Sequence, residues 1–430
     1  MCETKVARCG CGESKLVLPD GWKSLCLGEL VCLDRETLTE TTPPDFMFYY
    51  LDIGSASQGK LQFPQNQIAF KDAPSRARKV VHRRDVLMST VRPNLKAFAF
   101  FDHSDDTCVA STGFAVLTAK ENVDPRFILY SILSDELTSQ IEALVVGSNY
   151  PAIASSQVCR LRVSAPPLPE QRKIARILTT VDKLIEKTEA LIAKYQSVKR
   201  GMMHDLFTRG VDEHGHLRPP YEEAPHLYKN TELGWIPKVW CVDRLDNLVE
   251  FWDGRRIPLK QEERDKIEGD IPYYGASGII DYIDRFLFDD ELVLLGEDGE
   301  NVLSRNLPLA FKISGRSWVN NHAHVLKPTA CVNIDFLTEY LESCDYSRIV
   351  SGSAQPKITQ NKLAPMKVKN PPRQEQDRIA FRLKSIAAGI VNEKKGADKL
   401  KLLKTALMQD LLTGKVRVKL DEAEEGCDHA

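Results

Sequence analysis

The sequence predicts an α+β protein built as an internal repeat. Two mixed α/β domains are separated by two long helices, which pack as an antiparallel intramolecular coiled coil with a pseudo-two-fold relation. Three observations predict this fold. The chain has 430 residues, too many for one ordinary core. The segment "PPLPEQRKIARIL" (166–178) returns as "PPRQEQDRIAFRL" (371–383). Each copy opens a helical pattern of about forty residues.

The repeat reaches beyond these two segments. The offset between the copies is 205 residues (371 − 166 = 205), and it also relates "MHDLFTRG" to "MQDLLTGK" at the ends of the helical patterns. The same offset relates "GSNYPAIASSQV" to "GSAQPKITQNKL" just before them. The chain therefore contains two copies of one plan: a start segment, a variable globular domain, a Gly-Ser…Pro loop and a long helix.

The two helical patterns predict a shared apolar seam. Apolar residues in the first copy alternate at spacings of three and four, which is the a/d pattern of a coiled coil, and the second copy carries a rougher stripe. Prolines before each copy suit the start of a helix. Because helices of this length need a partner to bury the seam, we expect them to pack on each other. The predicted seam residues are Ile174, Val181, Leu184, Leu191, Tyr195, Val198, Ile379, Ile386, Ile390, Leu400, Leu403 and Leu407.

These patterns divide the chain into five segments. Inside the globular domains we expect short buried strands within 85–93 and 291–299, an amphipathic helix over 126–145 and a shorter helix over 334–344. The region 209–232, rich in Pro, Glu and His, is typical of a linker. The predicted segments are a first domain over 1–163, a central helix over 164–209, a linker and second domain over 210–368, a C-terminal helix over 369–415 and a tail over 416–430.

Composition excludes several classes of protein. No apolar run approaches the roughly 18 residues of a membrane span, and the N-terminus has no apolar signal segment, so we expect a cytoplasmic protein without a membrane partner. The net charge of −2 argues neither for nor against nucleic acid, because local patches decide such binding. Eleven cysteines are scattered, and Cys9-Gly-Cys11 is the only tight pair, so no metal site is predicted.

Motifs for catalysis are weak. "NPPR" (370–373) resembles the Asn-Pro-Pro-aromatic motif of amino-methyltransferases, but Arg373 replaces the aromatic residue and the matching copy begins with Ala165. No Gly-rich loop follows a strand to hold S-adenosylmethionine, and no nuclease metal cluster or P-loop is evident. We therefore predict no catalytic residue, and we expect these prolines to begin a helix.

Candidate binding residues lie in the globular domains. The segment 76–96 carries seven basic residues against one acidic residue, a density that suits contact with phosphates, although a solvated basic face is the alternative. In the second domain the basic signal is thinner, and loops rich in Ser, Asn, Tyr and Gln take its place. Arg and Asn side chains also read base edges in the major groove. Composition alone does not separate these loops from ordinary turns.

At this point the motifs resemble a known family. The doubled "PP…EQ..IA..L" helix start, the "M..DL.T" helix end and the "GWIP..W" segment together resemble the specificity subunit of type I restriction–modification systems. The resemblance implies a non-catalytic subunit whose two target recognition domains each read one half of a bipartite double-stranded DNA target. It also implies that the helices fix the gap between the halves and dock two methyltransferase subunits, which bind S-adenosylmethionine, and that motor–nuclease subunits join the complex. No cofactor is expected in this chain itself.

The resemblance directs attention to particular loops for DNA contact. "STVRPNLK", "YYGASG", "NNHAHVL" and "GSAQPKIT" look like stretches of the family's recognition domains. A self-contained DNA methyltransferase or nuclease, and a coiled-coil scaffold with two protein-binding modules, stay open as alternatives. The candidate DNA-contacting residues are Arg83, Arg84, Arg92, Asn94, Lys96, Ser148, Asn149, Tyr150, Gly275, Ser277, Asn320, Asn321, His322, Gln355 and Lys357.

Overall fold

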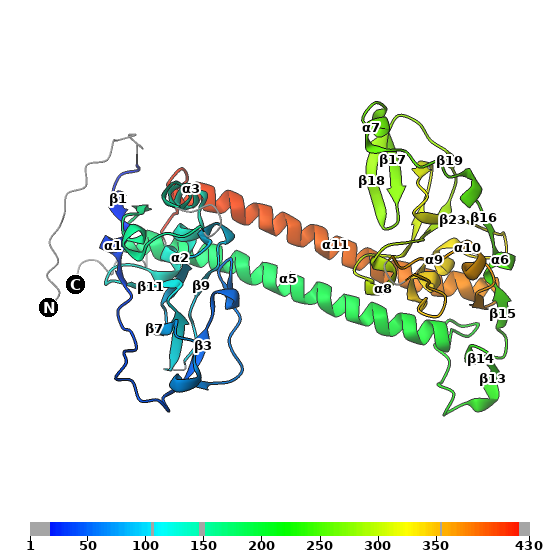
Figure 1. Cartoon of the computed structure of the whole chain (residues 1–430), viewed down its shortest axis with the longest axis horizontal. Helices are drawn as coiled ribbons and strands as arrows, with labels where there is room; N and C mark the ends of the chain where they lie inside the picture. The colour runs from blue at the N-terminus through cyan, green and yellow to red at the C-terminus, as the bar shows by residue number, and fades with distance from the viewer. Residues whose placement is uncertain (1–17, 105–106, 146–150, 353–354, 421–430) are drawn as a thin grey trace. The chain divides into compact units, whose positions relative to one another are not determined.

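The computed structural model describes residues 18–104, 107–145, 151–352 and 355–420 (Figure 1). Its contacts divide the chain into unit 1, residues 1–187 and 396–430, and unit 2, residues 188–395. Two long helices, α5 (Leu168–Thr208) and α11 (Arg373–Leu412), each contribute one end to each unit. The predicted helices therefore exist, each of about the expected length.

Unit 1 is built mainly of short strands. Its strands are β1 (Lys23–Cys26), β2 (Val31–Leu33), β3 (Met47–Leu51), β4 (Ala56–Ser57), β5 (Lys60–Leu61), β6 (Ile68–Ala69), β7 (Ala77–Val81), β8 (Val86–Ser89), β9 (Phe98–Phe100), β10 (Cys108–Ser111), β11 (Phe114–Ala119) and β12 (Arg162–Ala165). Within the described residues, one four-stranded sheet has the order β2-β11-β8-β9 and another the order β6-β3-β10-β7. The antiparallel pair β1–β12 joins the beginning of the unit to the segment just before α5.

The helices of unit 1 are short apart from the ends of α5 and α11. They are α1 (Leu27–Leu30), α2 (Pro125–Leu133), α3 (Asp135–Leu144), α4 (Ser155–Val158) and the 3-10 turns η1 (Ile53–Ser55), η2 (Phe70–Asp72) and η3 (Pro93–Leu95). The single helix predicted over 126–145 is wrong, because it breaks at Ser134. That residue is extended, and its side chain accepts a hydrogen bond from the N–H of Leu137, which starts α3 anew.

Unit 2 repeats this plan. Its strands are β13 (Tyr228–Thr231), β14 (Gly234–Pro237), β15 (Cys241–Arg244), β16 (Val249–Phe251), β17 (Glu268–Gly275), β18 (Gly278–Ile283), β19 (Phe288–Asp289), β20 (Leu292–Gly296), β21 (Ala310–Ile313), β22 (Arg316–Val319), β23 (Ala323–Pro328) and β24 (Lys367–Asn370). Its helices are α6 (Leu245–Leu248), α7 (Gln261–Arg264), α8 (Asn301–Ser304), α9 (Ile334–Ser343), α10 (Gln360–Leu363) and the 3-10 turns η4 (Pro225–Leu227) and η5 (Asp253–Arg255).

Corresponding strands have corresponding neighbours in the two units. The order β16-β23-β20-β21 matches β2-β11-β8-β9, and the second sheet, β18-β17-β22-β19, has the parallel pair β17–β22 where unit 1 has β3–β10. The pair β15–β24 likewise matches β1–β12. The predicted internal repeat is therefore confirmed. The region predicted as a linker is ordered in part, since β13 and β14 form an antiparallel hairpin.

The two long helices pack antiparallel within each unit. In unit 1, Leu178 near the start of α5 and Leu411 near the end of α11 belong to one apolar core that also contains Phe127 of α2. In unit 2 the ends are exchanged, since Leu206 of α5 shares a core with Leu383 of α11. The start of each helix thus lies beside the end of the other, which confirms the predicted antiparallel packing (Figure 1).

The phase of the seam on α5 differs in part from the prediction. Ile174 and Val181 are buried as expected, and Leu191 and Tyr195 are half-buried. Leu184 and Val198 are 46% and 45% exposed, so their assignment to the seam is wrong. The buried neighbour of Leu184 is instead the adjacent isoleucine at 185. Where two apolar residues are adjacent, as at 184 and 185, either one can satisfy the apolar spacing of the seam. Adjacent residues point about 100° apart around a helix, and packing decides which of them is buried.

The seam on α11 contains one similar correction. Ile379 and Ile390 are buried, and Ile386, Leu400 and Leu407 are half-buried, as expected. Leu403, however, is 47% exposed, so its assignment was wrong. The next residue, Lys404, turns inward instead, and its Nζ lies 2.7 Å from a carboxylate oxygen of Asp182 on α5. An ion pair occupies the place that the apolar pattern assigned to leucine.

The repeated glutamine of the "EQ" motif ties each long helix to its unit. Gln171 is buried, and its side-chain oxygen accepts a hydrogen bond from the N–H of Asp124, the N-cap of α2. Gln376 does the same with the N–H of Asn333, the N-cap of α9. Because these N–H groups have no partner inside their own helices, the glutamines satisfy otherwise orphaned donors. The motif is therefore structural.

The repeated glutamate lies beside the segment that follows the other long helix. Glu375, at the start of α11, accepts hydrogen bonds from both terminal nitrogens of Arg218, which lies ten residues beyond the end of α5. Glu170, at the start of α5, accepts from Arg417 after the end of α11 and from the indole N–H of Trp22. Both glutamates are almost fully buried. The twofold repetition of the sequence thus supplies two equivalent helix-end contacts.

The "NPPR" segment has the structural role expected of it. The prolines at 371 and 372 precede the first residue of α11, Arg373. The amide nitrogen of Asn370 donates to Asp243 on the neighbouring strand β15, at 2.8 Å. The motif therefore joins the last strand of unit 2 to its long helix.

Candidate nucleic-acid interface

Three segments that are distant in sequence meet at one end of β20 in unit 2. The N–H of Asn320 donates to the carbonyl of Tyr274, which joins the turn after β22 to the end of β17. The N–H of Glu297 donates to the carbonyl of His322, and Lys357 forms a β-bridge with the segment just after β20. The structure therefore brings together the candidates from 275–277, 320–322 and 355–357.

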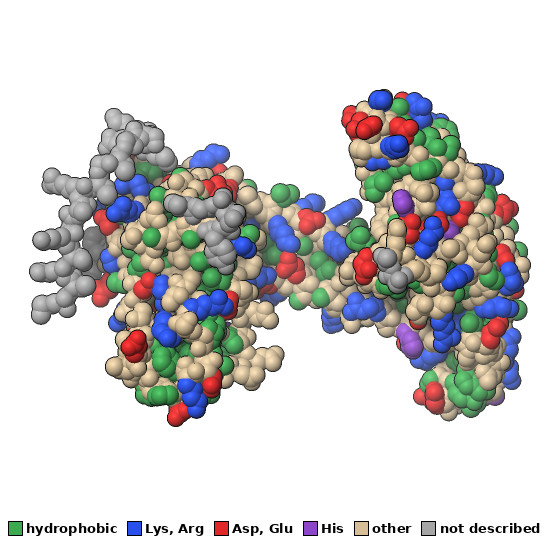
Figure 2. Space-filling model, in the orientation of Figure 1, with side chains coloured by type: hydrophobic (Ala, Val, Ile, Leu, Met, Phe, Trp, Pro, Cys, Tyr) green, Lys and Arg blue, Asp and Glu red, His purple; other side chains and the backbone are tan. Residues whose placement is uncertain are grey.

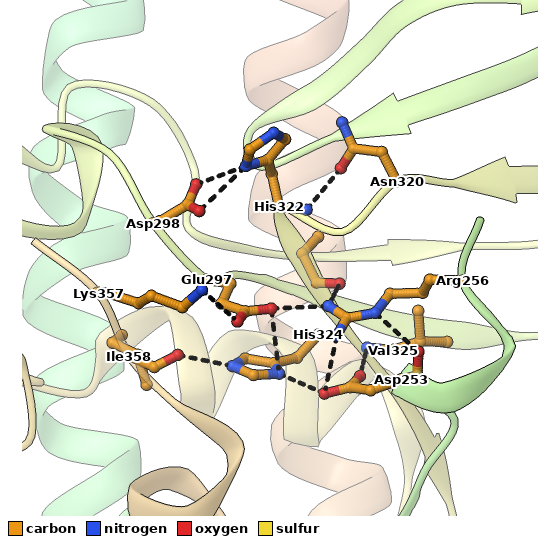
Figure 3. Close-up of polar contacts among 11 residues, drawn as sticks. Asp253, Arg256, Glu297, Asp298, Asn320, His322, His324, Val325, Lys357 and Ile358 are labelled. Carbon is orange, nitrogen blue, oxygen red and sulfur yellow. Dashed lines mark hydrogen bonds and ion pairs between the residues drawn. The ribbon is translucent and has the colours of Figure 1, made fainter. Parts of the chain in front are cut away.

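The turn after β22 presents two exposed polar side chains. Asn320 is buried, and its side-chain oxygen accepts a hydrogen bond from the N–H of His322 at 2.8 Å, which closes the turn. Asn321 and His322 are exposed. The Nδ1 atom of His322 lies 2.9 and 3.0 Å from the two carboxylate oxygens of Asp298 (Figure 3). Hydrogen bonds thus close the turn and orient its imidazole ring.

A buried histidine lies beneath this turn. His324 is 1% exposed, and its Nδ1 atom lies 2.6 Å from a carboxylate oxygen of Asp253. Its Nε2 atom lies 2.9 Å from the carbonyl oxygen of Ile358 (Figure 3). Each ring nitrogen of this histidine therefore lies opposite an oxygen that can accept a hydrogen bond. The histidine ties the loop before α10 to β23.

Charged side chains surround this histidine. The guanidinium of Arg256 donates to Glu297 at 2.7 Å, and the Nζ atom of Lys357 lies 3.1 Å from the other carboxylate oxygen. Burial alone would raise the pKa of Glu297, but the hydrogen bond from Arg256 and the positive charge of His324 hold that pKa below its usual value. The carboxylate is therefore ionised, and it fixes Lys357 at the rim of the cluster.

The surface of unit 2 at these loops is mixed in charge. Figure 2 shows basic, acidic and histidine side chains interspersed on this unit rather than one continuous basic surface. Gln355 is exposed, and Ser277 lies beside Asn301 at 3.3 Å. At Gly275 an added Cβ would come 3.1 Å from Ile280, so a larger residue would press on the strand β18. The loops offer hydrogen-bonding groups on a fixed frame.

The same frame exists in unit 1. The N–H of Arg92 donates to the carbonyl of Pro151, and in unit 2 the N–H of Gly299 donates to the carbonyl of Pro356. The two prolines are related by the repeat offset of 205. The N–H of Thr90, just after β8, donates to the carbonyl of Gly113. In unit 2 the N–H of Glu297, just after β20, donates to the carbonyl of His322. Arg92 thus corresponds to Gly299, and Gly113 corresponds to His322. Equivalent loops therefore meet in both units with different side chains.

The structure separates the basic candidates of unit 1. Arg92 and Asn94 are exposed and follow β8. Lys96 donates to the carbonyl of Leu133 at 3.0 Å and so is held at the end of α2. Arg83 and Arg84 precede β8, at the other end of the strand.

The candidates at the two ends of β8 also have different partners. Arg83 lies 3.3 Å from Asp102, which also pairs with Arg126 of α2. The four basic candidates therefore do not form one patch. The remaining candidates of unit 1, Ser148, Asn149 and Tyr150, lie outside the described residues.

Sequence reasoning missed the buried part of the cluster in unit 2. Asp253, Arg256, Glu297, Asp298 and His324 were not among the candidates, because single acidic and basic residues in loops are common. A signal was nevertheless present in the strand "AHVLKP". Side chains alternate along a strand, so a histidine next to an apolar run is expected to face the core and to need polar partners.

Exposed polar loops on a shared frame are the common feature of the two units. Among residues 18–104, 107–145, 151–352 and 355–420, no three His, Cys, Asp or Glu side chains are grouped so as to hold a metal ion. None of the described helices is long and apolar enough to cross a membrane. A duplicated frame with dissimilar exposed polar loops defines a protein with two recognition modules.

Comparison with known proteins gives the family. The profile of the type I restriction modification DNA specificity domain matches residues 19–195 and 237–402, which is most of the chain. The chain therefore belongs to this family. Both matches include one globular domain and most of a long helix, in agreement with the repeat.

Two relatives illustrate the similarity. The chain is 28% identical over 335 residues to the type I restriction enzyme MjaVIII specificity subunit of Methanocaldococcus jannaschii, covering 72% of this chain and 75% of that protein. It is 25% identical over 190 residues to the type I restriction enzyme HindI specificity subunit of Haemophilus influenzae, covering 43% and 40% respectively.

Solved structures share the fold. The specificity subunit of a type I system from M. genitalium aligns with a TM-score of 0.60 at 17% identity, covering 93% of this chain and 98% of that one. A chain from a structure on complex assembly and conformational transition of a type I system aligns with a TM-score of 0.56 at 22% identity, covering 94% and 100%. The similarity confirms the predicted two-unit fold with long helices.

Proposed function

We propose that this chain is the DNA-recognition subunit of a type I restriction–modification complex, in which each unit reads one half of a bipartite double-stranded DNA target. The observation that carries the proposal is the duplicated frame: the same loops meet in both units, but Arg92 in unit 1 corresponds to Gly299 in unit 2, and Gly113 corresponds to His322. One frame with different exposed groups suits two different half-sites. Family membership supports the same assignment.

The partners follow from this role. The chain docks two methyltransferase subunits on its long helices, and these bind S-adenosylmethionine and methylate adenine, while motor–nuclease subunits complete the restriction enzyme. The chain itself performs no catalysis. The missing S-adenosylmethionine loop in the sequence supports this division of labour, as do the names of the relatives, which are specificity subunits.

The test is selective DNA binding by the assembled complex. The chain is purified with a methyltransferase partner and incubated with a pool of random duplexes, and the bound duplexes are sequenced. We expect enrichment of one bipartite sequence, with affinity that falls steeply as salt rises. Lys357→Ala should lower the salt slope by about one if Lys357 contacts a phosphate. Enrichment of no sequence, with binding insensitive to salt, would contradict the proposal.

A self-contained methyltransferase or nuclease is the alternative. Its distinguishing property is binding of S-adenosylmethionine by the purified chain alone, measured by calorimetry. Binding at micromolar ligand concentrations would support this alternative. Binding that requires the methyltransferase partner supports the recognition subunit.

A further inference from the structure

His322 combines a fixed ring with a free nitrogen. Its side chain is 48% exposed, and Nδ1 is held by both carboxylate oxygens of Asp298, whose own side chain is only 12% exposed. Asn320 fixes the backbone of the turn. Among the described residues, nothing forms a hydrogen bond with Nε2 of His322. The exposed nitrogen is thus presented at a defined position (Figure 3).

The partner of Nδ1 determines the chemistry of Nε2. A carboxylate only accepts, so Nδ1 carries a hydrogen, and in the neutral ring Nε2 is then an acceptor. In the major groove of DNA, the amino groups of adenine and cytosine are the base-edge donors, whereas guanine and thymine present acceptors. A neutral ring held in this way matches adenine or cytosine and is mismatched to guanine and thymine.

We propose that His322 reads one base of the half-site bound by unit 2, by accepting a hydrogen bond at Nε2 from an adenine or cytosine amino group, and that Asp298 is the positioning residue that sets the ring. This inference rests on the proposed function and assigns a specificity determinant within it.

Unit 1 supports the assignment by contrast. Its equivalent turn carries Gly113, where an added Cβ would come 2.4 Å from Ile53, so no side chain fits there without displacing its neighbour. Among the loop candidates of unit 1 that the structure describes, the exposed side chains follow β8, on Arg92 and Asn94. The turn at His322 therefore has no counterpart side chain at Gly113, and a change at His322 should affect one half-site alone.

The experiment compares enriched targets of the assembled complex carrying wild-type chain, His322→Ala, His322→Gln or Asp298→Asn. The matched control is His214→Ala, because His214 is exposed in the segment after α5 and contacts none of the three loops. The wild type should show a clear base preference at one position of one half-site. His322→Ala should lower that preference by about 5- to 150-fold and leave the other half-site unchanged, which also shows that the variant is folded.

The remaining variants separate reading from positioning. Glutamine reads adenine through its amide, so His322→Gln should retain a preference if the base is adenine. In Asp298→Asn the amide can donate to Nδ1, which permits the other ring tautomer, and the preference at the same position should weaken or move towards guanine. His214→Ala should match the wild type.

Three results would overturn the inference. They are an unchanged target for His322→Ala, equal relaxation of both half-sites, and the same loss of preference in His214→Ala as in His322→Ala. Failure of the proposed function gives a different result, because the wild-type complex would then enrich no bipartite sequence.

Discussion

The glutamate that begins α11 provides a sharp test of how the helix ends are held. The side chain of Glu375 is 4% exposed, and it binds Arg218 through two hydrogen bonds of 2.5 and 2.9 Å. Arg218 is itself only 13% exposed. Glu375→Gln removes the charge and leaves the guanidinium without its counter-ion. Breaking a buried ion pair in this way costs about 3–5 kcal/mol of the free energy of unfolding.

The repeat supplies a matched variant. Glu170 occupies the same place at the start of α5, but its partner Arg417 is 48% exposed. Water can solvate that guanidinium after Glu170→Gln, and the indole N–H of Trp22 can still donate to the glutamine oxygen. We therefore expect a smaller loss of stability for Glu170→Gln than for Glu375→Gln, although the two positions correspond in sequence.

The assay is thermal unfolding followed by tryptophan fluorescence, with hydrogen exchange to assign the loss to a unit. For a unit of this size, 3–5 kcal/mol corresponds to a fall of roughly 6–20 °C in Tm. Glu375→Gln should increase exchange in unit 2 around Trp240, and Glu170→Gln should increase it in unit 1 around Trp22. Equal losses for the two variants, or a larger loss for Glu170→Gln, would refute the dependence on partner burial.

Three further predictions test packing, backbone conformation and thiol chemistry. Ile185→Ala should lower the free energy of unfolding by about 2–4 kcal/mol and Leu184→Ala by less than about 0.5 kcal/mol in urea denaturation, and the reverse order would contradict the phase of α5. Gly201→Ala, in an open helical position, should stabilise by about 0.5–1 kcal/mol, whereas Gly210→Ala should destabilise, because φ is +64° and its Cβ would lie 2.1 Å from a carboxylate oxygen. Burial raises the pKa of the half-buried Cys344 to about 12, so this thiol should react with iodoacetamide at pH 8 far more slowly than the exposed thiols, and rapid labelling seen by mass spectrometry would refute the raised pKa.

Much of the fold was predictable because the relevant signals are local or repeated. Proline placement and apolar spacing depend on neighbours within a few residues, so two long helices were expected after the prolines, in segments that begin at 164 and 369. The helices begin at Leu168 and Arg373. The break between α2 and α3 was missed, because Ser134 is compatible with a helix as well as with a cap. In the structure Ser134 has an extended backbone, and its side chain accepts the hydrogen bond that caps α3.

The sequence indicated which loops form the candidate interface, but it did not indicate which of their residues lie close together. The segments containing Gly275, Asn320 and Lys357 were named from the sequence and meet in space. Arg83 and Arg92 looked alike in one basic run, yet a strand separates them. A run of basic residues in the sequence does not show that the residues lie at the same end of a strand.

The sequence by itself determined the duplication, the two long helices and the family, because these are written in spacing and in repeated motifs. Only the tertiary structure decided which of two adjacent residues, Leu184 or Ile185, enters the seam, and that His324 is buried between Asp253 and a backbone carbonyl. Those outcomes depend on contacts between segments far apart in the chain. A helix carries several possible faces, and a histidine several possible partners, until the neighbouring elements pack against them.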